Sequence, residues 1–301
     1  MGPDWRDGDR RRLLDLRRAA GAWGYRATTA TAVEPTALAG LALLGTDPEA
    51  SAVAAGRLAT VRGRDGALGV TDGGAKPGWP TPYASLLWAA VGGHEADRAA
   101  ALGWLLATEG APIPLAERGP LGHDTTLIGW PWVAGTHSWV EPTALALLAL
   151  GREGKLDHPR ARAGVAVLCD RAIPTGGWNL GNPVVFGTAL RPLPGPTGLA
   201  LLALAQIGGP PAAAVAPAIR YLRSALAGTL ARASLGWGLL GLRAWGAAPG
   251  AAESWLGRAS ARAAGRPANV PGLALLLLAG GPRSLDDLGI APRNEASTDA
   301  S

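Results

Sequence analysis

The seven residues VEPTALA occupy positions 33–39, and the same seven recur at positions 140–146. A run of leucine and alanine follows both copies. Weaker copies read PTGLALL at 196–202 and PGLALL at 271–276. Because self-similarity along a chain is typical of repeat architectures, we expect one structural unit to recur through the whole sequence.

A tryptophan beside a glycine precedes most of these runs. Five such tryptophans are separated by 56, 51, 48 and 59 residues: Trp23, Trp79, Trp130, Trp178 and Trp237. An interval near fifty residues has room for two helices and their connections. We expect these five indoles to pack between neighbouring repeats, each with its N–H group hydrogen-bonded.

Proline at helix starts, apolar periodicity and glycine stops predict twelve helices. Six are rich in alanine and leucine on every side: 35–44, 82–91, 142–150, 196–207, 235–246 and 271–279. Six carry charge on one face: 7–19, 48–61, 94–107, 158–171, 212–227 and 251–263. A helix that is apolar all round must be enclosed by protein. The strict alternation therefore predicts an all-α fold, an (α/α)6 toroid of six outer–inner pairs over residues 1–282, followed by a flexible tail over 283–301.

The connections that lead from charged to apolar helices are long in the first four pairs, at 20–34, 62–81, 108–141 and 172–195. In an up-down ring, all connections of one kind lie at one end. Long loops on a rigid scaffold are where binding residues usually lie. We therefore expect the functional site at the end that carries these loops and the amino termini of the apolar helices.

The composition excludes several classes of protein. The 301 residues carry a net charge of +5, but the arginines are scattered, and the one cluster near residues 10–18 is interleaved with aspartates. We therefore expect no nucleic-acid partner. The longest uncharged window, 192–219, is interrupted by proline and glycine, so a membrane-spanning helix is not expected, although peripheral membrane contact stays open. With one cysteine, Cys169, the chain is expected to be cytoplasmic and to have no disulfide.

The Gly-Trp turns followed by Pro-Thr-Ala-Leu-Ala runs resemble the repeats of the prenyltransferase and squalene-hopene cyclase superfamily. Segments 129–143 and 177–182 are similar to bacterial members without a known reaction. The resemblance covers residues 20–280 and implies a single toroid that takes an isoprenoid or another apolar small molecule. The Asp-x-Asp-Asp motif of the cyclases, the zinc motif of the protein prenyltransferases and the glutamine of the cyclase repeat do not occur here.

Candidate site residues come from the long loops and from the starts of the apolar helices. Asp72 and Asp124 are candidate general acids, provided that burial raises the pKa of either carboxyl group; the alternative is that they accept hydrogen bonds in glycine-rich turns. Trp132 and Trp139 could present ring faces to an isoprenoid, a sugar or a cation, or simply pack locally. His137 lies between them.

Three further residues have two interpretations each. Glu34 and Glu141 precede apolar helices, where a carboxylate either caps the first turn or binds a ligand. Asn179 either forms a turn beside Gly181 or contacts a ligand. No spacing of ligands predicts a metal site, and no motif predicts a cofactor.

Three functions remain open on these grounds. The first is a terpene-cyclase- or prenyltransferase-like protein that binds or converts an apolar substrate. The second is a non-catalytic binding or scaffold toroid, and the third is a carbohydrate-active toroid, which would need paired carboxylates. The oligomeric state is left open by the sequence.

Overall fold

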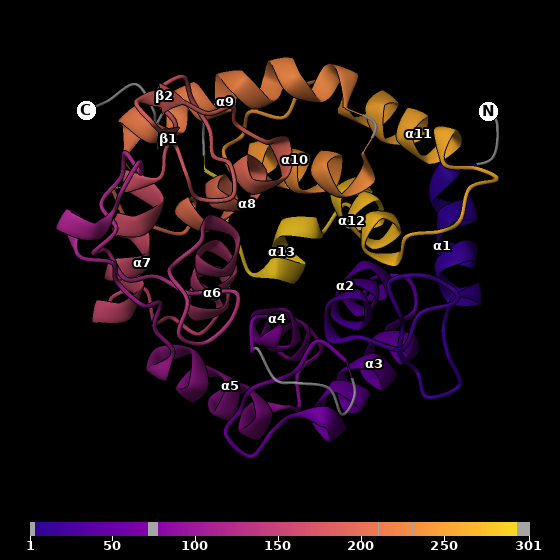
Figure 1. Cartoon of the computed structure of the whole chain (residues 1–301). Helices are drawn as coiled ribbons and strands as arrows, with labels where there is room; N and C mark the ends of the chain where they lie inside the picture. The colour runs from indigo at the N-terminus through magenta and orange to yellow at the C-terminus, as the bar shows by residue number, and fades with distance from the viewer. Residues whose placement is uncertain (1–3, 72–77, 210, 230, 294–301) are drawn as a thin grey trace. The chain divides into compact units, whose positions relative to one another are not determined.

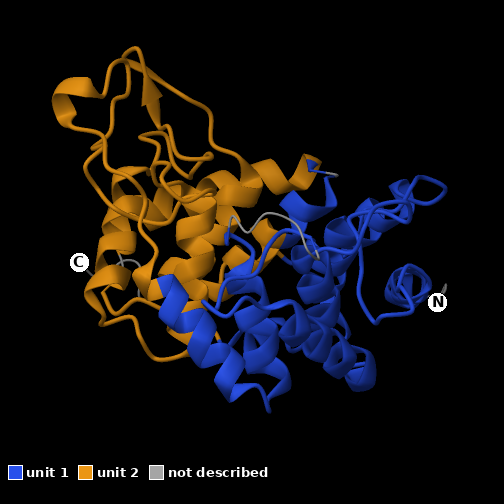
Figure 2. Cartoon of the chain, turned by 60° about the horizontal axis from the view of Figure 1, so that its bottom comes forward, with its two compact units in different colours: residues 1–105, 229–236, 250–289 blue, residues 106–228, 237–249, 290–301 orange. Residues whose placement is uncertain are grey.

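The computed structural model describes residues 4–71, 78–209, 211–229 and 231–293 (Figure 1). Contacts divide the chain into two compact units, each made of several segments (Figure 2). Unit 1 contains residues 1–105, 229–236 and 250–289, and unit 2 contains residues 106–228, 237–249 and 290–301. Almost all regular structure in the described residues is helical, so the predicted all-α fold is confirmed.

Unit 1 is organised around three apolar helices. Its elements are α1 (Trp5–Asp15), α2 (Val33–Leu43), α3 (Pro48–Val61), α4 (Thr81–Val91), most of α5 (Glu95–Ala107), the first turn of α10 (Arg232–Ala244), α11 (Ala252–Arg262), α12 (Val270–Gly280) and α13 (Ser284–Leu288). Helix α2 packs against α3, α4 and α12. Most residues of α2, α4 and α12 are buried, whereas α1, α3, α5 and α11 bury one face.

Unit 2 repeats this pattern with two apolar helices. Its elements are η1 (Leu115–Glu117), α6 (Val140–Arg152), α7 (Pro159–Asp170), β1 (Val184–Val185), β2 (Thr188–Ala189), α8 (Pro194–Leu204), α9 (Ala212–Ala225), η2 (Leu226–Gly228) and the rest of α10. Helix α6 packs against α7 and α8, and α8 packs against α9. Strands β1 and β2 form an antiparallel hairpin that the sequence did not predict.

All twelve predicted helices are present with ends shifted by a few residues, and the short helix α13 is additional. Beyond residue 282, α13 contacts α4 and α12 and buries Leu288. Arg293 also lies over the ring of Trp245, with 5.4 Å between its guanidinium carbon and the ring centroid. In the described part of the chain, no helix is long and apolar enough to cross a membrane.

The threonine of the repeated motif explains why the motif recurs. The hydroxyl of Thr36 accepts a hydrogen bond from the backbone N–H of Trp23 at 2.9 Å. Thr143 does the same for Trp130 at 3.0 Å. The hydroxyl of Thr197 accepts a hydrogen bond from the backbone N–H of Trp178, and that of Thr81 accepts one from the N–H of Leu68, both at 2.9 Å. Each buried threonine thus fixes the loop that precedes its own helix by satisfying a buried backbone donor.

The tryptophan rings are also held by the helices that precede them. The indole N–H of Trp23 donates to the carbonyl of Leu13, and that of Trp178 donates to Leu168, both at 2.7 Å. Trp23, Trp130, Trp178 and Trp237 are buried, as predicted. Trp79 is half-buried and differs from the other four.

A close helix–helix contact explains why the third copy of the motif has glycine where the first two have alanine. A Cβ atom on Gly198 would lie 2.2 Å from the carbonyl oxygen of Trp237 in α10. Any side chain at this position would therefore push the backbones of α8 and α10 apart.

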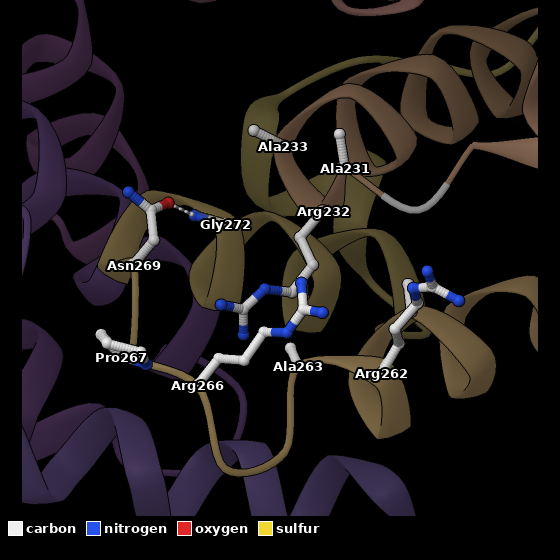
Figure 3. Close-up of a pocket in the computed structure, with 10 residues that line it drawn as sticks. Ala231, Arg232, Ala233, Arg262, Ala263, Arg266, Pro267, Asn269 and Gly272 are labelled. Carbon is white, nitrogen blue, oxygen red and sulfur yellow. Dashed lines mark hydrogen bonds between the residues drawn. The ribbon is translucent and has the colours of Figure 1, made fainter.

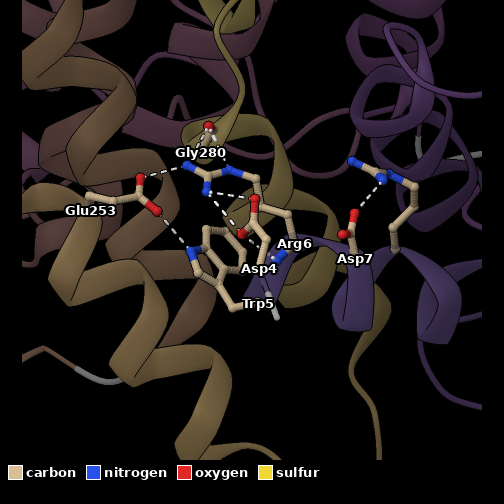
Figure 4. Close-up of polar contacts among 7 residues, drawn as sticks. Asp4, Trp5, Arg6, Asp7, Glu253 and Gly280 are labelled. Carbon is tan, nitrogen blue, oxygen red and sulfur yellow. Dashed lines mark hydrogen bonds and ion pairs between the residues drawn. The ribbon is translucent and has the colours of Figure 1, made fainter. Parts of the chain in front are cut away.

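The amino terminus of unit 1 is fastened by α1 (Figure 4). The guanidinium of Arg6 pairs with Glu253 of α11 at 2.5 Å and donates from Nε to the carbonyl of Gly280 in α12 at 3.1 Å. The indole of Trp5 donates to the other oxygen of Glu253 at 2.8 Å. These bonds tie α1 to both α11 and α12.

Candidate functional site

The side chain of Glu34 lies at the start of α2, where three segments of unit 1 meet. Its Oε2 accepts a hydrogen bond of 2.6 Å from the hydroxyl of Tyr25, in the loop between α1 and α2. The hydroxyl of Tyr83, on α4, is its second partner. The backbone N–H of Val270 donates to the carbonyl of Tyr25 at 3.0 Å, which joins the start of α12 to the same place.

Burial raises the pKa of the Glu34 carboxyl group above its usual value. The hydrogen bonds from Tyr25 and Tyr83 act in the opposite direction, because hydroxyl donors favour the carboxylate, but burial prevails. Burial and the neighbouring Glu34 also raise the pKa of the Tyr25 hydroxyl. Tyr25 therefore keeps its proton and acts as a donor.

An aromatic ring extends this cluster. The rings of Trp79 and Tyr83 meet edge to face, with 6.3 Å between their centroids and 78° between their planes. Trp79 is the one repeat tryptophan that is only half-buried, so part of its ring is accessible. We call Tyr25, Glu34, Trp79 and Tyr83 the Glu34 cluster.

Neither Glu34 nor Glu141 is the N-cap residue of its helix. The N-cap residues of α2 and α6 are Ala32 and Trp139, and neither helix has a side-chain cap hydrogen bond. The first turns are instead joined to the protein through backbone N–H groups: Val33 donates to Val70, and Val140 donates to Leu180, each at 3.0 Å. The carboxyl of Glu34 is thus available for its tyrosine partners.

The predicted residues of unit 2 form a second group. The rings of His137 and Trp139 lie 4.4 Å apart at 39° in the loop before α6, and Glu141 is in the first turn of that helix. Trp132, in the same loop, is half-buried. A Cβ atom on Gly181 would lie 3.2 Å from the Trp139 ring, so that loop packs tightly against the indole.

Asp124 does not have the environment expected of a general acid. Its carboxylate accepts hydrogen bonds from the backbone N–H and the hydroxyl of Thr126, at 2.9 and 2.6 Å. These bonds lower the pKa of Asp124. The turn-forming alternative describes its surroundings, whereas the other candidate acid, Asp72, lies outside the described residues.

Asn179 uses its side chain within its own loop. Its Oδ1 accepts hydrogen bonds from the N–H groups of Gly181 and Asn182, at 2.9 and 3.0 Å. Its Nδ2 donates to the carbonyl of Asn182 at 2.8 Å. The structure therefore places Asn179 as a turn former.

The sequence interpretation missed the tyrosines and Trp79 as site residues. The chain has three tyrosines, and two of them contact Glu34, so their scarcity was the available signal. Among the residues that the structure describes, no three His, Cys, Asp or Glu side chains gather in a way that could hold a metal ion.

No protein-family model and no curated protein matches the chain. Several solved structures do resemble it. A protein from Actinoplanes is 17% identical, with 94% of this chain and 99% of that chain covered and a TM-score of 0.60. A glycosidase variant is 12% identical, with coverage of 96% and 97% and a TM-score of 0.54.

A variant of the type II terpene cyclase MstE from Scytonema is also similar. It is 19% identical, with 93% of this chain and 78% of that chain covered and a TM-score of 0.50. The glycosidase and the cyclase have α/α toroid-type folds. At these identities the likeness concerns the fold alone.

Proposed function

We propose that the chain is an enzyme of the prenyltransferase and terpene-cyclase type, in which the carboxyl group of Glu34 donates a proton to an apolar, isoprenoid-like substrate. The observation that carries the proposal is the half-buried carboxyl group of Glu34, which accepts a hydrogen bond of 2.6 Å from Tyr25 and has Tyr83 as a second donor. Burial raises its pKa. We further propose that the two units together form the (α/α)6 toroid that the repeats predict. The structural likeness to the terpene cyclase supports this arrangement.

The proposed step needs few groups. The acidic proton of Glu34 would be transferred to one carbon of a C=C bond, and the π electrons would form the new C–H bond. The positive charge then rests on the adjacent carbon, where aromatic faces such as Trp79 are suited to stabilise it. Tyr25 and Tyr83 would stabilise the Glu34 carboxylate left behind, because their hydroxyl groups already donate to it.

A second candidate reaction uses the same acid. Glycoside hydrolysis begins with protonation of the glycosidic oxygen by a carboxylic acid whose pKa is raised. The structural likeness to a glycosidase supports this candidate as much as the first. It also requires a second carboxylate about 5–10 Å from the acid. Among the described residues, only Tyr25 and Tyr83 act with burial on the pKa of Glu34, and no carboxylate does.

A third possibility, a scaffold without catalysis, predicts that no substrate is turned over. The test is incubation with squalene, polyprenyl diphosphates, polyprenylated aromatics and a panel of aryl glycosides, with products identified by mass spectrometry. Conversion of a polyene that Glu34→Gln abolishes and Asp124→Asn preserves would support the proposal. Glycoside cleavage alone would contradict the proposal and support the carbohydrate-active function. Turnover of none of these compounds would support the scaffold function.

The pH dependence gives an independent check on the role of Glu34. A general acid works in its protonated form, so the rate should fall as pH rises through the pKa of the group. Tyr25→Phe removes a hydrogen bond that lowers this pKa, so it should move the fall to higher pH. A fall that stays in place in Tyr25→Phe would point to a different acid.

A further inference from the structure

A pocket of about 500 Å³ in unit 1 lies between the start of α10, the end of α11 and the start of α12. Such a volume is in the range of small-molecule sites, roughly 300–1,000 Å³. Three of the residues that line it are arginines, Arg232, Arg262 and Arg266. The described residues that line it include no aspartate or glutamate. No residue of the Glu34 cluster is among the described residues that line the pocket.

The arginines reach the pocket from different segments. Arg232 is the first residue of α10, Arg262 ends α11, and Arg266 lies in the connection to α12. Figure 3 shows the side chains of Arg232 and Arg266 extending towards each other. Arg262 lies to one side of these two, and the described residues that line the pocket include no carboxylate.

The guanidinium groups of Arg262 and Arg266 make no hydrogen bond or ion pair with the residues that the structure describes. Arg266 takes part in the local structure through its carbonyl oxygen, which accepts a hydrogen bond from Arg12. Its side chain is therefore not needed to hold the connection in place. Unpaired donors that face a pocket are available to a ligand.

Arg232 is the most buried of the three arginines, and its charge is only partly compensated by a carboxylate. Its Nη1 atom is buried and has no hydrogen-bond partner. Burial lowers its pKa, while the charge of the nearby Asp9 acts in the opposite direction. One carboxylate oxygen of Asp9 is likewise buried without a partner, so Asp9 and Arg232 do not satisfy each other. Arg232 thus brings to the pocket a third guanidinium group, which the nearby Asp9 compensates only in part.

Two of the three helix ends at the pocket are amino termini, which add to the positive field, whereas the carboxyl end of α11 acts against them. Helices α10 and α12 both begin at the pocket, and Gly272 of α12 is part of its lining. The amino terminus of a helix carries partial positive charge. This contribution is secondary to the three guanidinium groups.

We propose that this pocket binds the diphosphate group of a small molecule. Guanidinium groups bind phosphate oxygens through paired, charge-assisted hydrogen bonds. A diphosphate carries more negative charge than a single phosphate and spreads it over two linked groups, so guanidinium groups from three segments can share it. The volume that remains has room for an organic substituent.

The test is a calorimetric titration of the full chain with inorganic pyrophosphate and, separately, with inorganic phosphate. The double variant Arg262→Gln/Arg266→Gln should bind pyrophosphate about tenfold more weakly or worse, because hydrogen bonds to charged groups are lost. Its thermal unfolding should match the wild type, since neither guanidinium has a partner among the residues that the structure describes. The matched control is Arg191→Gln/Arg220→Gln, which removes two exposed arginines of unit 2.

The proposal is supported if pyrophosphate binds one to one, binds more tightly than phosphate, and is weakened by the pocket variant but not by the control. Equal weakening in both variants would mean attraction by net charge alone and would overturn it. So would binding of phosphate as tight as that of pyrophosphate, or no saturable binding at millimolar concentration.

A second arm separates a free diphosphate from a lipid headgroup. Phosphatidylcholine vesicles with and without phosphatidic acid are mixed with the protein and sedimented. If pyrophosphate binds in solution and phosphatidic acid does not increase sedimentation, the free ligand is supported. If sedimentation increases and the pocket variant abolishes the increase, the pocket takes a lipid headgroup and the proposal is wrong.

Discussion

The two copies of VEPTALA have the same scaffold but different surroundings. In both, the threonine binds the N–H of the preceding tryptophan, at 2.9 Å for Thr36 and at 3.0 Å for Thr143. The residues around the two motifs, however, differ. Glu34 meets Tyr25, whose hydroxyl lies 2.6 Å from its Oε2.

The difference arises from residues outside the repeated motif. Tyr25 follows Trp23 by two residues, and the matching residue after Trp130 is Trp132. Tyr83 follows Thr81 by two residues, and the matching residue after Thr197 is Leu199. The remaining tyrosine, Tyr221 of unit 2, donates to the carbonyl of Pro192. The repeat therefore builds the scaffold, and single substitutions around it decide where acid chemistry can occur.

The largest effect should come from replacing each of the two glutamates with glutamine. Glu34→Gln should lower the rate on any polyene that the wild type converts by about 100-fold or more, because a positioned general acid contributes about 10²–10⁴. Glu141→Gln should keep most of the activity. Rates are measured by product formation under saturating substrate. Equal losses in the two variants would show that the two copies do not differ in this way.

Much of the scaffold could be predicted from sequence, because its signals are local. Proline at helix starts, glycine at stops and all-round apolar runs give the twelve helices of the structure. The short helix α13 was missed because its five residues carry no periodicity, and its burial depends on contacts with α4 and α12.

The site was less accessible to sequence reasoning. Glu34 was a candidate, but its partners come from a loop and from α4, and only the folded chain brings them together. Tyr83 lies inside an apolar helix, where it is easily taken for core. Asp124 was chosen on the condition that burial raises its pKa, whereas its bonds to Thr126 lower the pKa.

The next effect distinguishes the outer helices of the two units. Arg160 follows Pro159 in α7, and Glu49 follows Pro48 in α3. The guanidinium carbon of Arg160 lies 4.3 Å from the ring centroid of Trp130. The same guanidinium donates hydrogen bonds to the carbonyls of Thr108, Ile128 and Gly129. Arg160→Met should therefore lower the free energy of unfolding by roughly 3 kcal/mol in urea titrations.

The matched control is Glu49→Met, at an exposed position. It should change the free energy of unfolding by less than about 0.5 kcal/mol. Similar losses for both variants would mean that the arginine contacts add nothing to unit 2.

A smaller effect should be the same in both copies of the motif. Thr36→Val and Thr143→Val each leave a buried backbone N–H without its acceptor, and each should cost about 1–3 kcal/mol of unfolding free energy. Thr60→Val, at an exposed position of α3, serves as the control in the same urea titrations. If only one of the two motif variants loses stability, the shared scaffold is not equivalent in the two units.

The smallest effect is a change of stability with pH. The folded pKa of Glu34 is raised, so the folded state holds this proton more tightly than the unfolded state. The resulting stabilisation is fully present below the unfolded pKa, about 4.3, and is lost as pH rises through the folded pKa. Relative to wild type, Glu34→Gln should therefore become more stable as pH rises from the unfolded pKa through the folded pKa of Glu34. Urea midpoints at successive pH values measure this change. A constant difference would mean that the folded and unfolded pKa values are equal.

The central claim is that Glu34 holds its proton more tightly than an ordinary glutamate. It is tested most directly by an NMR titration of the side-chain carboxyl carbon in protein labelled with ¹³C-glutamate, with Glu34→Gln to assign the resonance. We predict a midpoint above the ordinary glutamate pKa of about 4.3, since burial outweighs the two tyrosine donors. A midpoint at or below this value would contradict the raised pKa of Glu34.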